Sequence, residues 1–368
     1  MIPFNDLNRT PAPLRAALAA GVQRVLDRGW FILGPECDAF EHEFAAYCGA
    51  AHCVSVANGT DALELALRAL GIGPGDEVVT AANAGGYSST AIRLAGAQPR
   101  YAEIDPATRN LSAAHLAGAI TPRTRAVIAT HLYGCMADVA ALLEVTQRAG
   151  VPLIEDCAQA HGASIAGRKA GTWGAMGCFS FYPTKNLGAC GDGGAVIASD
   201  AALARRVMSL RQYGWSRKYH SAETGRNSRM DEMQAAILRA KLPLLDGWNR
   251  RRREIAARYS AALAGSAVDC PRGFGDEYVA HLYVIRVARR DETREELKAC
   301  GIATDVHYPV PDHLQEAASR AGAVPPALPE TERAAGEVLT LPCYPELREE
   351  EIESIADALR ALAERNRP

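Results

Sequence analysis

The sequence predicts an α/β protein whose large domain carries a mostly parallel sheet, followed by a smaller C-terminal α+β domain. Short apolar runs alternate with amphipathic helical stretches through the first two-thirds of the chain, a pattern typical of a parallel sheet with helices on both faces. The pattern changes near Leu242-Pro243, after which fewer strand-like runs occur. The 368 residues are enough for one large and one smaller domain. We therefore predict domains at residues 1–245 and 246–368.

The expected elements follow from local patterns, taken in chain order. An apolar run at 53–57 predicts a strand, Asn58-Gly59-Thr60 a turn, and residues 61–70 a helix in which Asp61 and Glu64 have the spacing of a cap and its N3 acid. After the GIGPGD turn, further short strands are expected at 77–80, 126–130, 151–154 and 195–198. The smaller domain should contain a helix over 248–262, a strand over 281–287 and a closing helix over 349–364.

Composition excludes several classes of protein. The net charge is −3 and no long basic tract occurs, which argues against sequence-independent nucleic-acid binding. No run of 18 apolar residues predicts a membrane span, and MIPFNDLNRT has no signal-peptide pattern. The ten cysteines are scattered, without CxxC pairs or zinc-ligand spacing. We expect no metal site, reduced and mostly buried thiols, and a cytoplasmic protein.

The strongest chemical signal is the segment FSFYPTKNLG, which contains Lys185. The lysine lies between an apolar strand and the glycine-rich turn GACGDGG. Most lysines lie on protein surfaces, and a surface loop is the alternative interpretation. Apolar neighbours, however, favour the neutral amine by desolvation, and a neutral amine is what Schiff-base chemistry requires.

Two weaker signals accompany the lysine. In LIEDCAQAHG, Asp156 ends a buried strand, where ligands collect in open α/β sheets; an acid after a strand is also common without function. Asn58-Gly59-Thr60 precedes a helix, whose first N–H groups suit a phosphate, although an ordinary turn explains it equally well. Together a phosphate cup, an acid that can protonate a pyridine ring and a lysine match one cofactor, pyridoxal 5'-phosphate (PLP).

Longer stretches of the chain resemble the DegT/DnrJ/EryC1/StrS family of sugar aminotransferases. The matching segments are GWFILGPE (29–36), NGTDALELALRALGIGPGDEV (58–78), ITPRTRAVIATHLYG (120–134), LIEDCAQAHGA (153–163), FSFYPTKNLGACGDGGAV (179–196) and NSRMDEMQAAILRAKL (227–242). The resemblance implies the fold-type I architecture of aspartate aminotransferase and a homodimer with shared active sites.

The resemblance also implies roles for individual residues. Lys185 would carry the cofactor covalently, Asp156 would pair with the pyridine nitrogen, and Gln159 would lie by the ring and its phenolic oxygen. The phosphate would be held by Gly59, Thr60 and Ser180, and by Asn227 from the partner subunit.

One departure from the family pattern concerns the ring face of the cofactor. Many members read P-A-N-T-aromatic where this chain has Ala81-Ala82-Asn83-Ala84-Gly85, and the aromatic residue usually stacks on the ring. Here that position is glycine, and Tyr87 lies two residues on. Either Tyr87 swings in, or another group covers the ring.

The substrate expected from the resemblance is a nucleotide-linked keto-sugar. RKY (217–219), followed by GRNSRMDE, and HYPVPDHL (307–314) are similar to sugar 3-aminotransferases. Lys218 and Tyr219 could meet a diphosphate, or form a solvated basic loop. Tyr87, His307, Tyr308 and His313 would contact sugar or nucleotide, with surface histidines as the alternative.

The predicted reaction is amination of a nucleotide-linked 3-keto-6-deoxyhexose, with dTDP as the nucleotide that the resemblance implies, glutamate as amino donor and Lys185 as general base and acid. Three alternatives stay open: amination at C4 of a 4-keto-6-deoxyhexose, a PLP-dependent sugar dehydratase, and a non-enzymatic regulatory protein. Dehydratase relatives have histidine in place of the lysine, so Lys185 argues against that activity. A regulatory protein would have no need of Lys185, Asp156 and Gln159 together.

Overall fold

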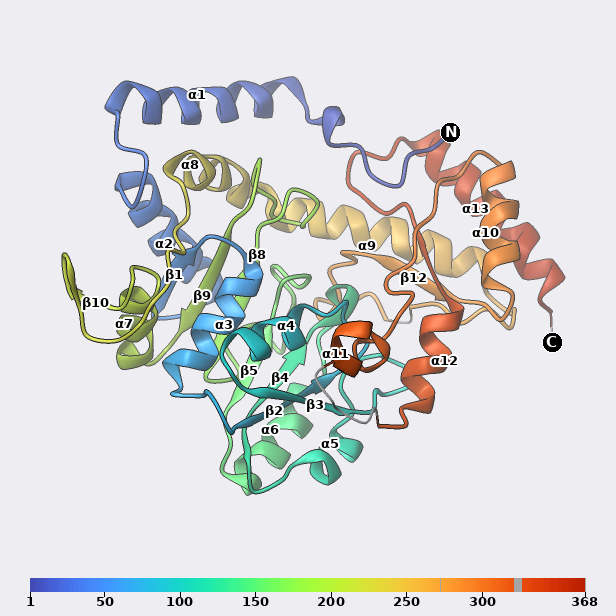
Figure 1. The fold of residues 1–368 in the computed structure, drawn as a ribbon. Helices are drawn as coiled ribbons and strands as arrows, with labels where there is room; N and C mark the ends of the chain where they lie inside the picture. The colour runs from blue at the N-terminus through green and yellow to red at the C-terminus, as the bar shows by residue number, and fades with distance from the viewer. Residues whose placement is uncertain (272, 321–325, 368) are drawn as a thin grey trace.

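A seven-stranded sheet forms the centre of the larger part of the molecule (Figure 1). The computed structural model describes residues 1–271, 273–320 and 326–367. The strand order is β1-β9-β8-β5-β4-β2-β3, and all of these strands run in one direction except β9. The strands are β1 (His52–Val56), β2 (Glu77–Ala81), β3 (Gln98–Ala102), β4 (Thr124–Thr130), β5 (Leu153–Asp156), β8 (Met176–Ser180) and β9 (Gly194–Ala198). The mostly parallel sheet is therefore confirmed.

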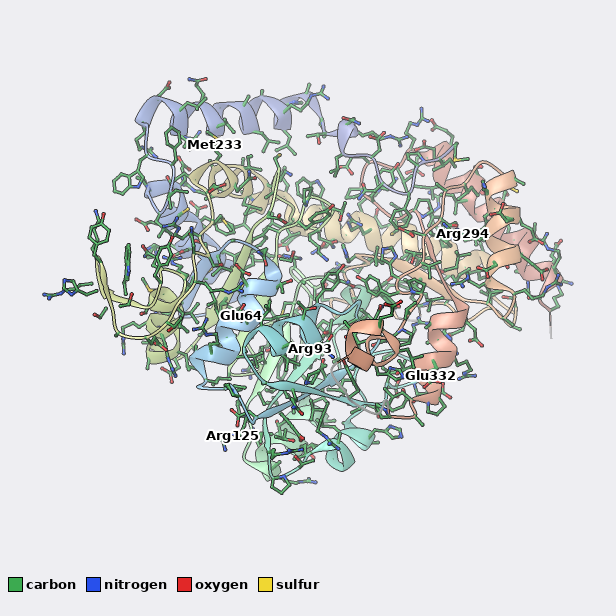
Figure 2. All side chains as sticks on the ribbon, in the orientation of Figure 1. Glu64, Arg93, Arg125, Met233, Arg294 and Glu332 are labelled. Atoms are coloured by element: carbon green, nitrogen blue, oxygen red, sulfur yellow. The ribbon has the colours of Figure 1, made fainter. Side chains whose placement is uncertain are left out.

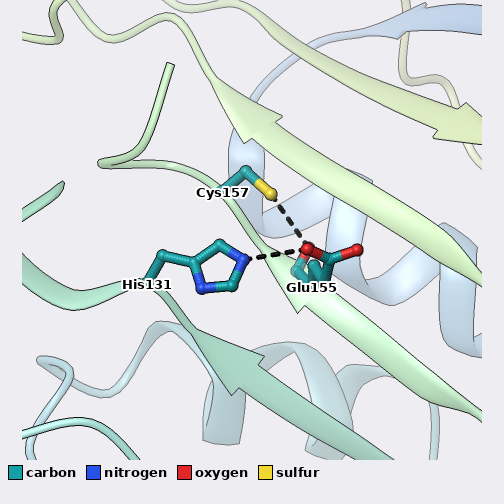
Figure 3. Close-up of side chains that lie close together, drawn as sticks. All are labelled: His131, Glu155 and Cys157. Carbon is teal, nitrogen blue, oxygen red and sulfur yellow. Dashed lines mark hydrogen bonds and ion pairs between the residues drawn. The ribbon is translucent and has the colours of Figure 1, made fainter. Parts of the chain in front are cut away.

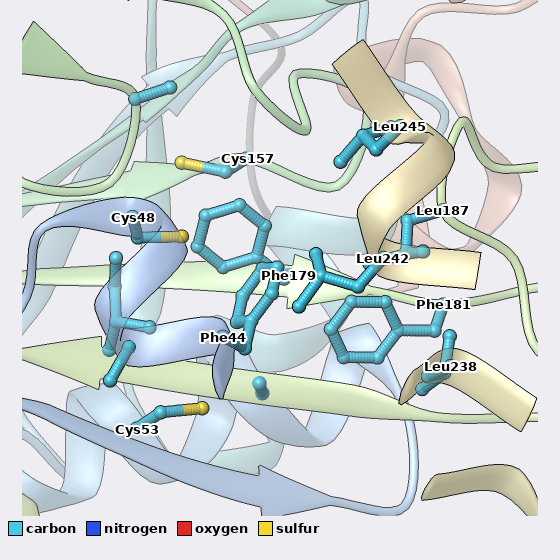
Figure 4. Close-up of a cluster of buried hydrophobic side chains, with 14 of the residues drawn as sticks. Phe44, Cys48, Cys53, Cys157, Phe179, Phe181, Leu187, Leu238, Leu242 and Leu245 are labelled. Carbon is cyan, nitrogen blue, oxygen red and sulfur yellow. The ribbon is translucent and has the colours of Figure 1, made fainter. Parts of the chain in front are cut away.

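Helices cover both faces of the sheet, because consecutive strand residues point to opposite sides. Phe179 packs on one face with Phe44 and Leu238 (Figure 4), whereas its neighbour Cys178 packs on the other face with Leu63. The helices of this part are α1 (Ala12–Arg28), α2 (Pro35–Cys48), α3 (Gly59–Ala69), α4 (Tyr87–Leu94), α5 (Ala113–Ala119), α6 (Val139–Ala149), α7 (Ala201–Leu210) and α8 (Glu232–Lys241). Two short hairpins project from it, β6–β7 (Ser164–Ile165, Arg168–Lys169) and β10–β11 (Trp215–Arg217, His220–Ser221).

The smaller part has its own core around a two-stranded antiparallel sheet. Tyr259, Tyr283, Leu339 and Ile355 are fully buried there. Its elements are α9 (Leu245–Ala262), β12 (Tyr283–Arg286), α10 (Arg290–Ala299), α11 (Glu316–Arg320), α12 (Pro329–Glu337), β13 (Val338–Leu341) and α13 (Glu349–Arg365). The start of the chain lies against this part, since Ile2 forms a parallel bridge with Ile302. The predicted domain boundary at residue 245 stays a prediction. The first residues of the chain, which the prediction assigned to the larger domain, lie beside the smaller part.

The first predicted helix begins two residues earlier than expected, at Gly59. Asn58, with extended backbone, is its cap, and its side chain accepts the Asp61 N–H at 2.8 Å. Asp61 is therefore the third helical residue and not the cap, because the Asn58 side chain already caps the helix by accepting the Asp61 N–H. Strand β5 runs on to Asp156 and so includes it.

Among the described residues, no helix is both long and apolar enough to cross a membrane.

Candidate active site

Lys185 and Asp156 meet at the carboxyl edge of two neighbouring strands. Strands β5 and β8 are parallel, with Asp156 opposite Cys178, so the loop after β8 passes over the end of β5. A cavity of about 310 Å³ opens here between the two parts of the molecule. Side chains along its wall include those of Lys185, Tyr87, Tyr182, Arg252, His281, His307 and Tyr308. The sheet edge thus brings together residues far apart in sequence, as expected for ligand sites in such sheets.

The Lys185 amine loses its proton more readily than that of an ordinary lysine. Its backbone N–H donates to the Tyr182 carbonyl at 2.8 Å, and the next residue, Asn186, donates from Nδ2 to Asn249 Oδ1 at 2.8 Å and to the Val279 carbonyl at 3.0 Å. Desolvation lowers the pKa of Lys185 to about 8, against the opposing pull of the Asp156 charge. The loop is therefore pinned, and its amine is a better nucleophile near neutral pH than an ordinary lysine.

We expect the reactivity of Lys185 to titrate with a midpoint near pH 8. Protonation removes the lone pair, so acetylation of the protein lacking cofactor should rise as pH increases through that value. Competitive labelling with acetic anhydride, read by mass spectrometry, measures this, with exposed Lys298 as internal reference. In Asp156→Asn the midpoint should fall, because the charge that supports the ammonium is gone. A midpoint above pH 10 in the wild type would contradict the assignment.

Asp156 is a buried carboxylate that lacks a cation in contact with it among the described residues. It is 4% exposed, and it accepts the Ala158 N–H and the Thr130 hydroxyl, each at 3.1 Å. Burial raises its pKa, and these two hydrogen bonds and the Lys185 charge oppose the rise. A protonated pyridine nitrogen beside it would supply the missing countercharge. The residues present therefore fit PLP at this point.

The amino end of helix α3 fits the phosphate. Its first N–H groups, at Gly59 and Thr60, have no acceptor within the helix. A Cβ at Gly59 would lie 2.6 Å from Ser180 Cβ, so only glycine lets the end of β8 approach the helix so closely. The predicted trio of Gly59, Thr60 and Ser180 is brought together here, as a phosphate cup requires.

Tyr308 fills the space beside Gly85, where the family aromatic is missing. Two of its ring atoms lie 2.9 Å from where a Cβ on Gly85 would be, and the backbone there has φ +81°. Its hydroxyl accepts from Gln159 Nε2 at 3.2 Å, and its ring meets that of Tyr87 edge-on at 6.1 Å. Gln159 Oε1 accepts the Tyr133 N–H at 2.6 Å. A tyrosine from the smaller part thus takes the place that residue 85 leaves open.

The other predicted site residues lie in different places. His307 lines the cavity and contacts Thr340 Oγ1 through Nδ1 at 2.9 Å. His313 lies outside the cavity wall and is buried, with Nε2 3.1 Å from Oε1 of Glu332, which Figure 2 shows on α12; its turn faces the protein interior, so the expected substrate contact is not supported. Lys218 and Tyr219 are exposed near the β10–β11 hairpin, which Figure 1 shows at the edge of the larger part, and Asn227 is exposed as well. These three residues do not line the cavity.

A buried cluster beside Asp156 has the residue types of a metal site, but its polar atoms are used in hydrogen bonds within the protein. His131 Nε2 lies 2.9 Å from Glu155 Oε2, and Cys157 is adjacent (Figure 3). The Glu155 carboxylate also accepts the N–H groups of residues 171, 173 and 174, and His131 Nδ1 accepts the Ala137 N–H at 3.1 Å. These contacts use the lone pairs that a metal ion would need.

Comparison with known proteins identifies the chain. A model of the DegT/DnrJ/EryC1/StrS aminotransferase family matches residues 14–360. The chain belongs to this family. It is 48% identical over 368 residues to a dTDP-3-amino-3,4,6-trideoxy-alpha-D-glucose transaminase of Streptomyces venezuelae, covering 99% of this chain and 97% of the relative. It is 44% identical to a UDP-N-acetyl-3-dehydro-alpha-D-glucosamine 3-aminotransferase of Acidithiobacillus ferrooxidans, covering 98% and 97%.

Solved structures of the family share the fold throughout the chain. The crystal structure of S. venezuelae DesV in complex with a ketimine intermediate superimposes with a TM-score of 0.95 at 48% identity and covers 99% of this chain and 98% of that one. The predicted fold-type I architecture and aminotransferase activity are thereby confirmed. The sequence predicts no site role for Tyr133, Asn186, Arg252 or His281. Tyr133 and Asn186 lie inside segments that match the family, but their contacts are made to distant parts of the chain. Arg252 and His281 lie outside the matching segments.

Proposed function

We propose that this aminotransferase converts a dTDP-linked 3-keto-6-deoxyhexose to the 3-amino sugar in the cytoplasm, with glutamate as amino donor. The observation that carries the proposal is full-length identity of 48% to a transaminase named for a dTDP-3-amino sugar. When bound, PLP supplies an electron sink that stabilises negative charge at the reacting carbon. The chain's own residues must hold it, protonate it and move the proton.

Each of these tasks has a residue in the cavity. Lys185 anchors the cofactor and, once displaced, is the base and acid that moves the proton at the reacting carbon. Asp156 would keep a ring nitrogen protonated, and Gln159, held by its hydrogen bonds to the Tyr133 N–H and the Tyr308 hydroxyl, would help to hold the cofactor. Tyr87, Tyr308 and His307 line the cavity and would help to keep water from the reacting atoms when cofactor and substrate are bound.

A second copy of the chain completes the site in this proposal. Lys218, Tyr219 and Asn227 are exposed and do not line the cavity that contains their own Lys185, so in this proposal they serve a neighbouring subunit. Apolar side chains near the end of α1 support a dimer interface, since Leu26, Trp30, Phe31 and Ile32 are between 36% and 55% exposed. Exposed groups of this kind mark protein contacts. Asn227 would then reach the partner's phosphate, and Lys218 and Tyr219 its nucleotide.

Mixed dimers should therefore recover activity from two inactive variants. A dimer of one Lys185→Ala subunit and one Asn227→Ala subunit has one site damaged twice and one site intact. Random mixing makes about half of the dimers mixed, so the mixture should show at most about a quarter of the wild-type activity. The assay is turnover after co-refolding, with each variant alone as control and PLP binding by Asn227→Ala measured first. Full activity of the wild type as a monomer would overturn the shared-site proposal.

Amination at C3 is expected in preference to C4. Lys185 and Asp156 serve either reaction, so the position of the sugar must decide, and misplacement by about 1 Å can cost roughly a hundredfold in rate. The wall of Tyr87, His307 and Tyr308 sets that position. Nucleotide-linked 3-keto and 4-keto sugars supplied in parallel, with product analysed by NMR, provide the test. An amine on C4 with the 3-keto sugar unreacted would establish the 4-aminotransferase instead.

A further inference from the structure

Arg252 differs from the other buried arginines of the protein. Of the arginines buried in the described residues, Arg109 lies 3.2 Å from Asp269, Arg211 lies 2.5 Å from Glu41 and Arg286 lies 2.7 Å from Glu337. Arg252 is equally buried, at 5% exposure. Among the described residues, however, no carboxylate pairs with it.

Only neutral groups hold the Arg252 guanidinium. Nη1 donates to the carbonyls of Ala280 at 3.5 Å, His281 at 3.3 Å and Cys343. Glu346 acts on it through space without an ion pair, and desolvation lowers its pKa. Carbonyl groups orient a guanidinium but do not neutralise it, and a buried charge without a countercharge is costly. Arg252 lines the same cavity as Lys185, so an anion entering there gains a ready partner.

His281, next to Arg252 in the wall, has a fixed tautomer. Asn186 Nδ2 points at the Val279 carbonyl, so Asn186 Oδ1 must face His281 Nδ1, at 3.0 Å. Nδ1 therefore carries the hydrogen. Burial and the Lys185 charge lower the pKa of His281 well below its usual value, which keeps the ring neutral. Nε2, which no described residue engages, is thus a lone-pair acceptor in the wall of the cavity.

We propose that Arg252 and His281 form the binding site for the amino donor, an α-amino acid. The guanidinium meets the α-carboxylate, and His281 Nε2 accepts a hydrogen bond from the α-ammonium group. An α-amino acid carries these two groups on one carbon, which matches a cation and an acceptor side by side next to Lys185. The diphosphate of a nucleotide sugar, in contrast, lies several bonds from the reacting carbon. This assignment rests on the proposed transamination and adds the place where its donor binds.

The two half-reactions separate donor binding from sugar binding. In Arg252→Lys, the glutamate concentration that half-saturates the first half-reaction should rise at least about tenfold, because a lysine cannot replace the planar guanidinium. The second half-reaction, with the keto-sugar and aminated enzyme, should stay within about twofold of wild type. Arg211→Lys is the matched control, equally buried but paired with Glu41, and should change neither. Equal loss in both half-reactions of Arg252→Lys, or no loss with glutamate, overturns the proposal.

A binding measurement distinguishes the two residues. Glutarate has the carboxylates of glutamate without the ammonium, so calorimetry should show weaker glutarate binding in Arg252→Lys but unchanged binding in His281→Leu. Glutamate should half-saturate the first half-reaction at higher concentration in both variants.

Should Arg252→Lys not fold, the wild type decides: 4-aminobutyrate, which lacks the α-carboxylate, must react at least about tenfold more slowly than glutamate, and equal rates refute the site. The glutamate half-reaction needs no sugar, so a failure with every keto-sugar would count against the proposed function alone.

Discussion

Lys185→Ala is expected to abolish turnover and the visible absorption of the bound cofactor. The amine is the covalent anchor and the proton carrier at once, and no second lysine lines the 310 Å³ cavity within the described chain. Loss of a group that acts both as nucleophile and as general acid and base should exceed a thousandfold in rate. Stopped-flow assays with glutamate and the keto-sugar, and absorption spectra after dialysis against PLP, measure the two effects.

Lys241 provides the matched control for this variant. Desolvation lowers its pKa too, but its Nζ donates to the Gly188 carbonyl at 2.6 Å and so is committed to the protein. Lys241→Met should keep the cofactor absorption and most of the turnover. If Lys185→Ala retained both properties while Lys241→Met lost them, the cofactor lysine would be misassigned. A depressed pKa alone does not make a Schiff-base lysine; the amine must also be free.

The residues predictable from sequence are those that local rules place at the sheet edge. Asp156 and Lys185 follow apolar runs that read as strands, and parallel strands bring such ends together. Gly59 and Thr60 open a helix, which gives them a role without knowledge of the tertiary structure. In these positions local secondary structure identifies the functional residue, although the loop that carries Lys185 is also held by contacts of Asn186 with Asn249 and Val279.

The residues that could not be predicted come from distant segments. Tyr308 takes the space beside Gly85 only because a loop of the smaller part folds over α4, and no local pattern specifies that crossing. His313, five residues further on in the same motif, turns inward to Glu332. Arg252 lies in a basic helix, yet one face of that helix is buried and Arg252 lines the cavity. Whether a charge is buried depends on packing between segments far apart in sequence.

Asp156→Asn is expected to lower kcat by a hundredfold to several thousandfold without unfolding the protein. The amide cannot hold a proton on the ring nitrogen, and breaking a buried charge pair costs about 3–5 kcal/mol. Its shape is retained, since Oδ1 can still accept the Ala158 N–H and the amide can donate to Thr130. Rates of both half-reactions, with ¹⁵N NMR of labelled cofactor for the protonation state of the ring, provide the measurement.

The stability of the same variant separates a functional role of Asp156 from a structural one. Burial raises the pKa of Asp156, so above that pKa the ionised side chain destabilises the folded protein lacking cofactor relative to the unfolded chain. Asp156→Asn removes this cost, and its cofactor-free form should melt at the same or a higher temperature at pH 7. Glu155→Gln is the contrast: that carboxylate accepts three backbone N–H groups and His131, so its loss should lower the melting temperature. A large drop in stability for Asp156→Asn, with ring protonation unchanged, would show that Asp156 supports the strand end and not the cofactor.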